Sequence, residues 1–332
     1  MSEYSPPLRD IKTALHQIAG LDEIISYPAF AHVDAETVAG ALDEAGRFMS
    51  EVVAPTLRAG DTIGARFSEG TVTTPAEFHK AWQEYVAAGW NAVDGAIEYG
   101  GHGFPRVVGL AVKEMLVTAN MAFSLNPMLT GSAITLLELH GSQEQRAVYL
   151  EKLISGEWTG TMVLTEPHAG SDLGTLLTKA IPRGDGSYAI SGTKIFITWG
   201  EHDLADNIIH LVLARIPEAP PGTKGISLFI VPKFLVASDG TPGERNAVRC
   251  VSIEHKLGIH GSPTCVMSFE DAIGYLVGEP NEGMRLMFTM MNQARIEVGL
   301  EGLAVAERAY QLARGYAAQR RQGRAAGAPP GT

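Results

Sequence analysis

Cysteine is scarce in this sequence, which contains only Cys250 and Cys265 among 332 residues. The pair could form a disulfide, share a metal or be two buried thiols, and its spacing does not favour a metal site. Residues 1–10 show no signal-peptide pattern, so we expect reduced thiols in the cytoplasm.

Positive charge is also in short supply. The 26 Lys and Arg residues are outnumbered by 37 Asp and Glu residues, which gives a formal net charge of -11. This balance disfavours nucleic acid and anionic membrane as partners. A small anionic ligand remains compatible with the sequence if the fold builds a local basic pocket.

A continuous hydrophobic span is missing as well. Residues 115–137 carry no charge and exceed the roughly 20 residues that a membrane helix needs. The stretch is interrupted by Asn120, Asn126, Pro127 and Gly131. We therefore predict two buried helices that meet at a break, and no membrane span.

A chain of 332 residues is long for one hydrophobic core, so we expect two or more structural units. The hydrophobic share of 45% and the charged share of 19% are those of a soluble globular protein. Apolar residues at helical spacing before residue 156 predict four or more helices. One follows the capping residue Asp34, and two others follow capping boxes at residues 74–77 and 142–145.

The hydrophobic period changes after Gly156. Short runs typical of strands lie at residues 158–164, 188–190, 208–216, 226–231 and 266–269. The helical period returns at about residue 282 and continues toward Arg320, whereas residues 323–332 show no helical pattern. The order of helices, strands and helices predicts a multidomain α+β protein.

Two segments carry most of the functional signal. Residues 165–172 read Thr-Glu-Pro-His-Ala-Gly-Ser-Asp and leave an expected strand, and residues 194–198 read Lys-Ile-Phe-Ile-Thr and end another. A flavin ring needs backbone groups and small hydroxyls at its polar edge and apolar cover on its faces. These residues offer such groups, although physical reasoning alone supports an ordinary polar turn about equally well.

The first segment resembles the flavin-binding signature of the acyl-CoA dehydrogenases, and the second resembles its usual companion. The similarity continues through residues 256–264, 269–271, 278–283 and 292–295, and so covers nearly the whole chain. It implies an N-terminal helical domain at residues 1–157, a flavin-binding middle β domain at 158–280 and the beginning of a C-terminal helical bundle at 281–332.

The resemblance also implies a reaction. Members of the family remove hydrogens from the α and β carbons of an acyl-CoA thioester: a Glu takes the α proton, and a hydride passes to N5 of FAD. The electrons leave through an electron-transfer flavoprotein, and a homodimer or homotetramer is expected. Residues 7–10, 200–203 and 220–225 look like the larger bacterial subgroup, which includes 3-methylmercaptopropionyl-CoA dehydrogenases and broad-specificity fatty acyl-CoA dehydrogenases.

Individual roles follow from the same resemblance. The positions that match flavin contacts are Met162, Leu164, Thr165, Gly170, Ser171, Phe196 and Thr198. Phe196 stands where many members have Trp, which keeps an aromatic cover. Ser171, Asn292 and Arg295 match substrate-facing positions, with Asn292 replacing a frequent Asp. Arg320 resembles the Arg that reaches the FAD pyrophosphate of a neighbouring subunit, a role that suits its guanidinium.

The family's catalytic base has no counterpart here. In most members it lies beyond the long helix, and in a minority it lies at the position of Ala294, which cannot take a proton. Glu297 is the nearby carboxylate, but two steps from Arg295 along a helix point to another side. We therefore expect the base beyond residue 332, in a longer enzyme of which this chain alone would be inactive. The alternative is a short protein that binds flavin or acyl-CoA without turnover.

Histidines raise the question of a metal. His202, and the pair His255 and His260, do not have the helical spacing that metalloproteases use. We expect no metal site.

Overall fold

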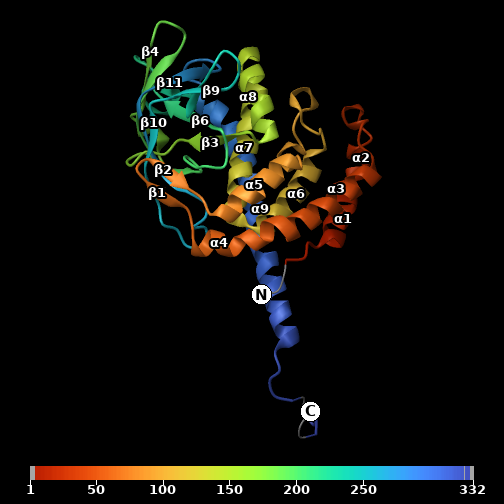
Figure 1. Cartoon of the computed structure of the whole chain (residues 1–332). Coiled ribbons are helices and arrows are strands. Elements are labelled where there is room, and N and C mark those ends of the chain that lie inside the picture. Colours follow the sequence, from red (N-terminus) through yellow and green to blue (C-terminus); the bar gives the residue numbers. More distant parts are fainter. Residues whose placement is uncertain (1–3, 325, 330–332) are drawn as a thin grey trace.

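The computed structural model describes residues 4–324 and 326–329 (Figure 1). The first half of the chain is helical. Its α-helices are α1 (Leu8–Gln17), α2 (Leu21–Ile24), α3 (Ala35–Phe48), α4 (Leu57–Thr62), α5 (Ala76–Ala87), α6 (Arg106–Ala119), α7 (Met121–His140) and α8 (Gln143–Ser155). A short hairpin of β1 (Arg66–Ser68) and β2 (Thr71–Thr73) separates α4 from α5.

The strands follow α8. They are β3 (Trp158–Val163), β4 (Lys179–Pro182), β5 (Tyr188–Thr198), β6 (Asn207–Ala214), β7 (Ser227–Pro232), β8 (Phe234–Val236), β9 (Pro242–Arg245), β10 (Val248–Ile253) and β11 (Thr264–Val277). The main sheet has the order β3-β6-β7-β11-β5-β4, and β10 pairs with β11. Only the β3–β6 pair is parallel among the described pairs of strands.

Strand β11 holds the sheet together. Its first part pairs with β5 on one side and β10 on the other, and its end, from Tyr275 to Val277, pairs with β7. Each predicted strand run overlaps one of these strands, the run at 208–216 continues two residues past β6, and β5 and β11 extend well beyond the predicted runs. The last described helix is α9 (Gly283–Gln319), which confirms the return of helical structure.

The predicted break in the uncharged stretch is confirmed at Asn120. Its side chain caps α7 by accepting from the Phe123 amide at 3.2 Å, and its amide donates to Thr56 at 2.8 Å. Pro127, in contrast, lies inside α7 without ending it. Within residues 4–324 and 326–329, no helix combines the length and apolar character needed to cross a membrane.

The two predicted capping boxes have different outcomes. Ser142 and Gln145 form the full reciprocal box at the start of α8. The box at Thr74 is wrong, because α5 begins after Pro75 without a side-chain cap. Thr74 instead donates its hydroxyl to Asp203 at 2.7 Å and so links the helical layer to the segment after β5.

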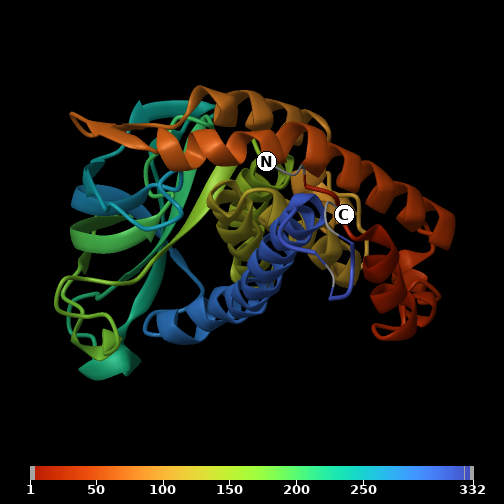
Figure 2. The same cartoon turned by 90° about the horizontal axis from the view of Figure 1, so that it is seen from below.

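Helix α9 connects the two layers (Figures 1 and 2). It starts beside β7, crosses α6 and α7, bonds the Ser5 backbone through Gln311, and then extends past the other helices. With 37 residues it is roughly 55 Å long. Its buried residues lie in the first two thirds, from Gly283 to Ala304. The predicted α+β fold is thus confirmed, while the domain limits at 157/158 and 280/281 remain our proposal.

Candidate functional site

The segment that leaves β3 is a turn built around a buried carboxylate. The backbones of Glu166 and Ala169 bond each other at 2.9 and 3.0 Å, which closes the turn. The Glu166 side chain is 3% exposed and accepts from the amides of Leu177 and Thr178 at 2.7 and 3.0 Å, and from the Thr178 hydroxyl at 2.6 Å. This carboxylate therefore fixes the turn and leaves Gly170 and Ser171 exposed at its tip.

Lys194 joins this turn to β5. Its ammonium is fully buried and donates to the Leu164 carbonyl at 2.8 Å and to Glu166 Oε1 at 2.9 Å. The next amide, that of Ile195, donates to the Thr165 carbonyl at 2.9 Å. The structure therefore brings together the two segments singled out in the sequence.

The Lys194–Glu166 pair perturbs both groups. Burial lowers the pKa of Lys194 to about 8, against the opposing effect of the Glu166 charge. Burial by itself would raise the pKa of Glu166, but the Lys194 charge and the donors from residues 177 and 178 hold it below its usual range. Both groups are charged at neutral pH, so the turn contains a buried ion pair.

A β-bulge aims Phe196 outward. The register of β5 against β11 shifts between Lys194 and Ile197, which leaves an extra residue on β5. Phe196 has a φ of 61° and its side chain is 57% exposed. A positive φ is costly for a large aromatic residue, and such strain is concentrated at functional sites. Phe196 is thus held at the surface beside the turn.

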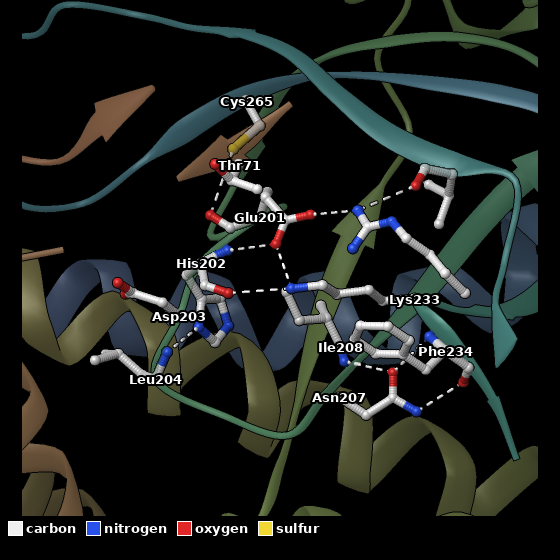
Figure 3. Close-up of polar contacts among 12 residues, drawn as sticks. Thr71, Glu201, His202, Asp203, Leu204, Asn207, Ile208, Lys233, Phe234 and Cys265 are labelled. Carbon is white, nitrogen blue, oxygen red and sulfur yellow. Dashed lines mark hydrogen bonds and ion pairs between the residues drawn. The ribbon is translucent and has the colours of Figure 1, made fainter. Parts of the chain in front are cut away.

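The end of β5 is anchored by a second buried cluster (Figure 3). Trp199 turns into the helical core and stacks on Phe78 with 6.5 Å between ring centroids. Glu201 then accepts from Lys233 and from Arg245, the latter at 3.0 Å, and Lys233 also donates to the His202 carbonyl at 3.2 Å. In the sequence, Thr198 therefore lies between Lys194, which pairs with Glu166, and Glu201, which pairs with Lys233.

The histidines have partners other than a metal. His202 Nδ1 accepts from the Leu204 amide at 3.1 Å, and its Nε2 contacts the Thr159 hydroxyl at 2.9 Å. The rings of His255 and His260 contact each other in a tilted arrangement, with centroids 4.5 Å apart and 34° between the ring planes. Across the described ranges, no group of three or more His, Cys, Asp or Glu side chains could hold a metal ion. Cys250 and Cys265 are free buried thiols.

The remaining predicted residues lie in different places. Met162 on β3 and Leu164, which directly follows this strand, contact the core that includes α7 and the start of α9. Asn292 and Arg295 are exposed on α9 and bond each other at 2.7 Å, with the guanidinium over the Phe288 ring. Arg320 ends α9, about 40 Å along the helix from Asn292. The end of α9 that precedes Arg320 extends away from the β layer that contains the turn (Figure 1).

Glu297 is committed to a buried network. It is 3% exposed and accepts from Lys113 on α6 at 2.8 Å and from Gln293 at 3.0 Å. Lys113 also lies 3.8 Å from Asp94. The carboxylate of Glu297 therefore points into the helical layer, while Ala294 offers no acidic group.

Glu301, one turn further along α9, gives a pH-dependent prediction. Burial and the neighbouring Glu297 charge raise its pKa to about 7, and its Oε1 has no hydrogen-bond partner. A raised pKa means that the folded state binds this proton more tightly than the unfolded state does. The contribution of Glu301 to the free energy of unfolding is therefore fully present below about pH 4.5, and it is lost as the pH rises through about 7. Thermal melting of Glu301→Gln against the parent should show a higher Tm for the variant at pH 8 and nearly equal Tm values at pH 4. A Tm difference that does not change with pH would contradict this assignment.

The fold and the site define a class of protein. A helical layer and a β layer are joined by a long helix, and the turn after β3 meets the bulged end of β5. At this junction the Thr165 amide and hydroxyl bond no described residue, and the Phe196 side chain is exposed. Comparison with known proteins gives the family. The acyl-CoA dehydrogenase N-terminal domain matches residues 36–157, and the acyl-CoA dehydrogenase middle domain matches residues 161–272. The chain belongs to the acyl-CoA dehydrogenase family.

Individual relatives are longer than this chain. It is 50% identical over 321 residues to the 3-methylmercaptopropionyl-CoA dehydrogenase of Ruegeria pomeroyi, covering 97% of this chain and 55% of the relative. It is 40% identical over 331 residues to a broad-specificity linear acyl-CoA dehydrogenase of Mycobacterium tuberculosis, covering 97% and 54%. The chain thus spans about half the length of these curated relatives.

Solved structures agree on the fold. The butyryl-CoA dehydrogenase of Megasphaera elsdenii superimposes with a TM-score of 0.70 at 27% identity, covering 86% of this chain and 70% of that one. An acyl-CoA dehydrogenase of Bacillus anthracis complexed with FAD gives a TM-score of 0.70 at 26% identity, covering 88% and 46%.

Proposed function

We propose that this chain is the flavin-binding part of an FAD-dependent acyl-CoA dehydrogenase that introduces an α,β double bond into an acyl-CoA thioester and passes the electrons to an electron-transfer flavoprotein. Family membership supports the reaction class, and an FAD complex among the similar structures supports the cofactor. The observation that carries the proposal is the junction of the turn and the bulged strand at the bond between Ile195 and Thr165.

The residues at this junction fit a flavin. The Thr165 amide and hydroxyl bond no other described residue, so both are free for the polar edge of the ring. Phe196 is exposed and can cover an apolar face and exclude water. Thr198 lies on the same strand, and Gly170 and Ser171 are exposed at the turn tip. When bound there, FAD supplies the hydride acceptor.

Two surfaces of the chain suit the other ligands. Ser171 on the turn and the Asn292–Arg295 pair on α9 are proposed to bind the acyl-CoA, with the guanidinium available to its anionic groups. Arg320, at the end of α9, is proposed to bind the FAD pyrophosphate of a neighbouring copy in a homodimer or homotetramer. The two buried free thiols support our expectation of a cytoplasmic location.

A binding protein without turnover is the second candidate. The observation that favours it is the position of the acidic groups on α9: Glu297 is bonded to Lys113, and Ala294 replaces the alternative base. We assign the catalytic base to none of the described residues.

Titration with FAD tests the proposed site. The purified chain should turn yellow on reconstitution, and Phe196→Ala should weaken FAD binding about tenfold, because one ring face loses its aromatic cover. Phe67→Ala is the matched control, since Phe67 is an exposed aromatic residue on β1, a strand that pairs with β2 and not with β5. A chain that cannot be reconstituted with FAD would overturn the proposal. Bleaching on anaerobic addition of acyl-CoA supports the dehydrogenase, and colour without bleaching supports the binding protein.

A further inference from the structure

The peptide bond between Leu164 and Thr165 has an unusual environment. Its carbonyl oxygen accepts from the Lys194 ammonium at 2.8 Å, inside the protein. Its N–H group, on Thr165, bonds no described residue. One end of this peptide is therefore bonded to a buried cation, and the other end is free at the flavin-binding junction.

A cation at the carbonyl changes what the N–H can do. Charge-assisted hydrogen bonds are roughly twice as strong as neutral ones, and they polarise the amide through which they act. The polarised amide holds more positive charge on its hydrogen and becomes a stronger donor. The effect is large here because Lys194 is fully buried and water does not screen its charge.

Glu166 keeps the cation in place. It bonds Lys194 at 2.9 Å through the same oxygen that accepts from Thr178. The Ile195 amide holds the other side of Thr165 through the Thr165 carbonyl at 2.9 Å. Thr165 therefore cannot rotate away from the junction, and its N–H has a fixed direction.

We propose that Lys194 is a positioning residue for the cofactor: through the Leu164–Thr165 peptide it strengthens the Thr165 N–H as a donor to the polar edge of FAD, and so stabilises the more electron-rich, reduced cofactor over the oxidised one. This inference rests on the proposed function, because it requires FAD at the junction. The negative charge of Glu166 has the opposite electrostatic effect and partly offsets the effect of Lys194 on the cofactor.

The test is the midpoint potential of FAD bound to the chain, measured with a dye-linked titration. Lys194→Met removes the cation, and we expect it to bind reduced FAD about tenfold less tightly relative to oxidised FAD, which lowers the potential by about 30 mV. Glu166→Gln keeps an acceptor for Lys194 but removes the negative charge, and it should raise the potential. Lys113→Met is the matched control, because Lys113 is an ion-paired lysine on α6 whose side chain is only 16% exposed, and it should leave the potential unchanged.

We expect the potential to fall in Lys194→Met and to rise in Glu166→Gln. If the two residues only stabilised the turn, both substitutions would loosen it and would shift the potential in the same direction. Shifts of equal sign, or no shift in a variant that binds FAD, would overturn the proposal while leaving the proposed function intact. If Lys194→Met does not fold, the Glu166→Gln variant tests the proposal by itself: a higher potential supports it, and an unchanged or lower potential overturns it. Failure of the parent chain to bind FAD would overturn the proposed function, and this inference with it.

Discussion

Replacement of Glu166 by Ala is expected to lower the free energy of unfolding by about 3–5 kcal/mol, because the substitution leaves a buried cation without its partner. Lys194 would keep only the Leu164 carbonyl, and the amides of Leu177 and Thr178 would lose their acceptor inside the protein. Urea unfolding of the cofactor-free chain, followed by Trp fluorescence, measures the loss.

Glu166→Gln is the control for this prediction. Its amide oxygen can still accept from Lys194 and Thr178, while its NH₂ group faces the Leu177 amide, so we expect an intermediate loss of about 1–3 kcal/mol. A loss for Glu166→Ala below about 1 kcal/mol would show that the ion pair does not support the turn.

The second large effect is expected at the contact between α6 and α9. Lys113→Ala leaves Glu297 buried without its cation, and Asp94 keeps only Arg106. Burial opposes the charge on Lys113, but the charges of Asp94 and Glu297 outweigh it and raise the pKa of Lys113 above its usual value. We expect a loss of about 3–5 kcal/mol in the same unfolding measurement.

A double variant separates the ion pair from general packing. Lys113→Met with Glu297→Leu removes both charges and fills similar volumes, so it should recover most of the stability lost by Lys113→Ala. A double variant as unstable as the single one would mean that the charges are not the cause of the loss.

The sequence predicts the large elements of this fold because they have strong local signals. The cap at Asp34, the box at Ser142 and the break at Asn120 each depend on residues close to one another in the chain. Thr74 shows the limit of such signals. The local sequence predicts that Thr74 caps a helix, but its hydroxyl donates a hydrogen bond to Asp203, which lies far along the chain.

The sequence predicts part of the candidate site. The two segments that meet at Thr165 and Ile195 stand out in the sequence, but only resemblance to a family connects them to a flavin. The buried pair of Glu166 and Lys194 lies inside those segments without a local pattern that identifies it, because each partner is defined by a tertiary contact. The bulge that exposes Phe196 depends on the register with β11 and could not be predicted from β5 alone.

The pairing of β11 with both β7 and β5 affects the order in which the protein can fold during synthesis. The turn after β3 is made early, but the strand that joins the two parts of its sheet ends only at Val277. Pairing between segments far apart in sequence is slow, because the intervening chain must be ordered first. We expect the helices up to α8 to fold on the ribosome before β11 has been synthesised. Until then the sheet is incomplete and has unpaired strand edges, and we expect chaperones to bind this intermediate.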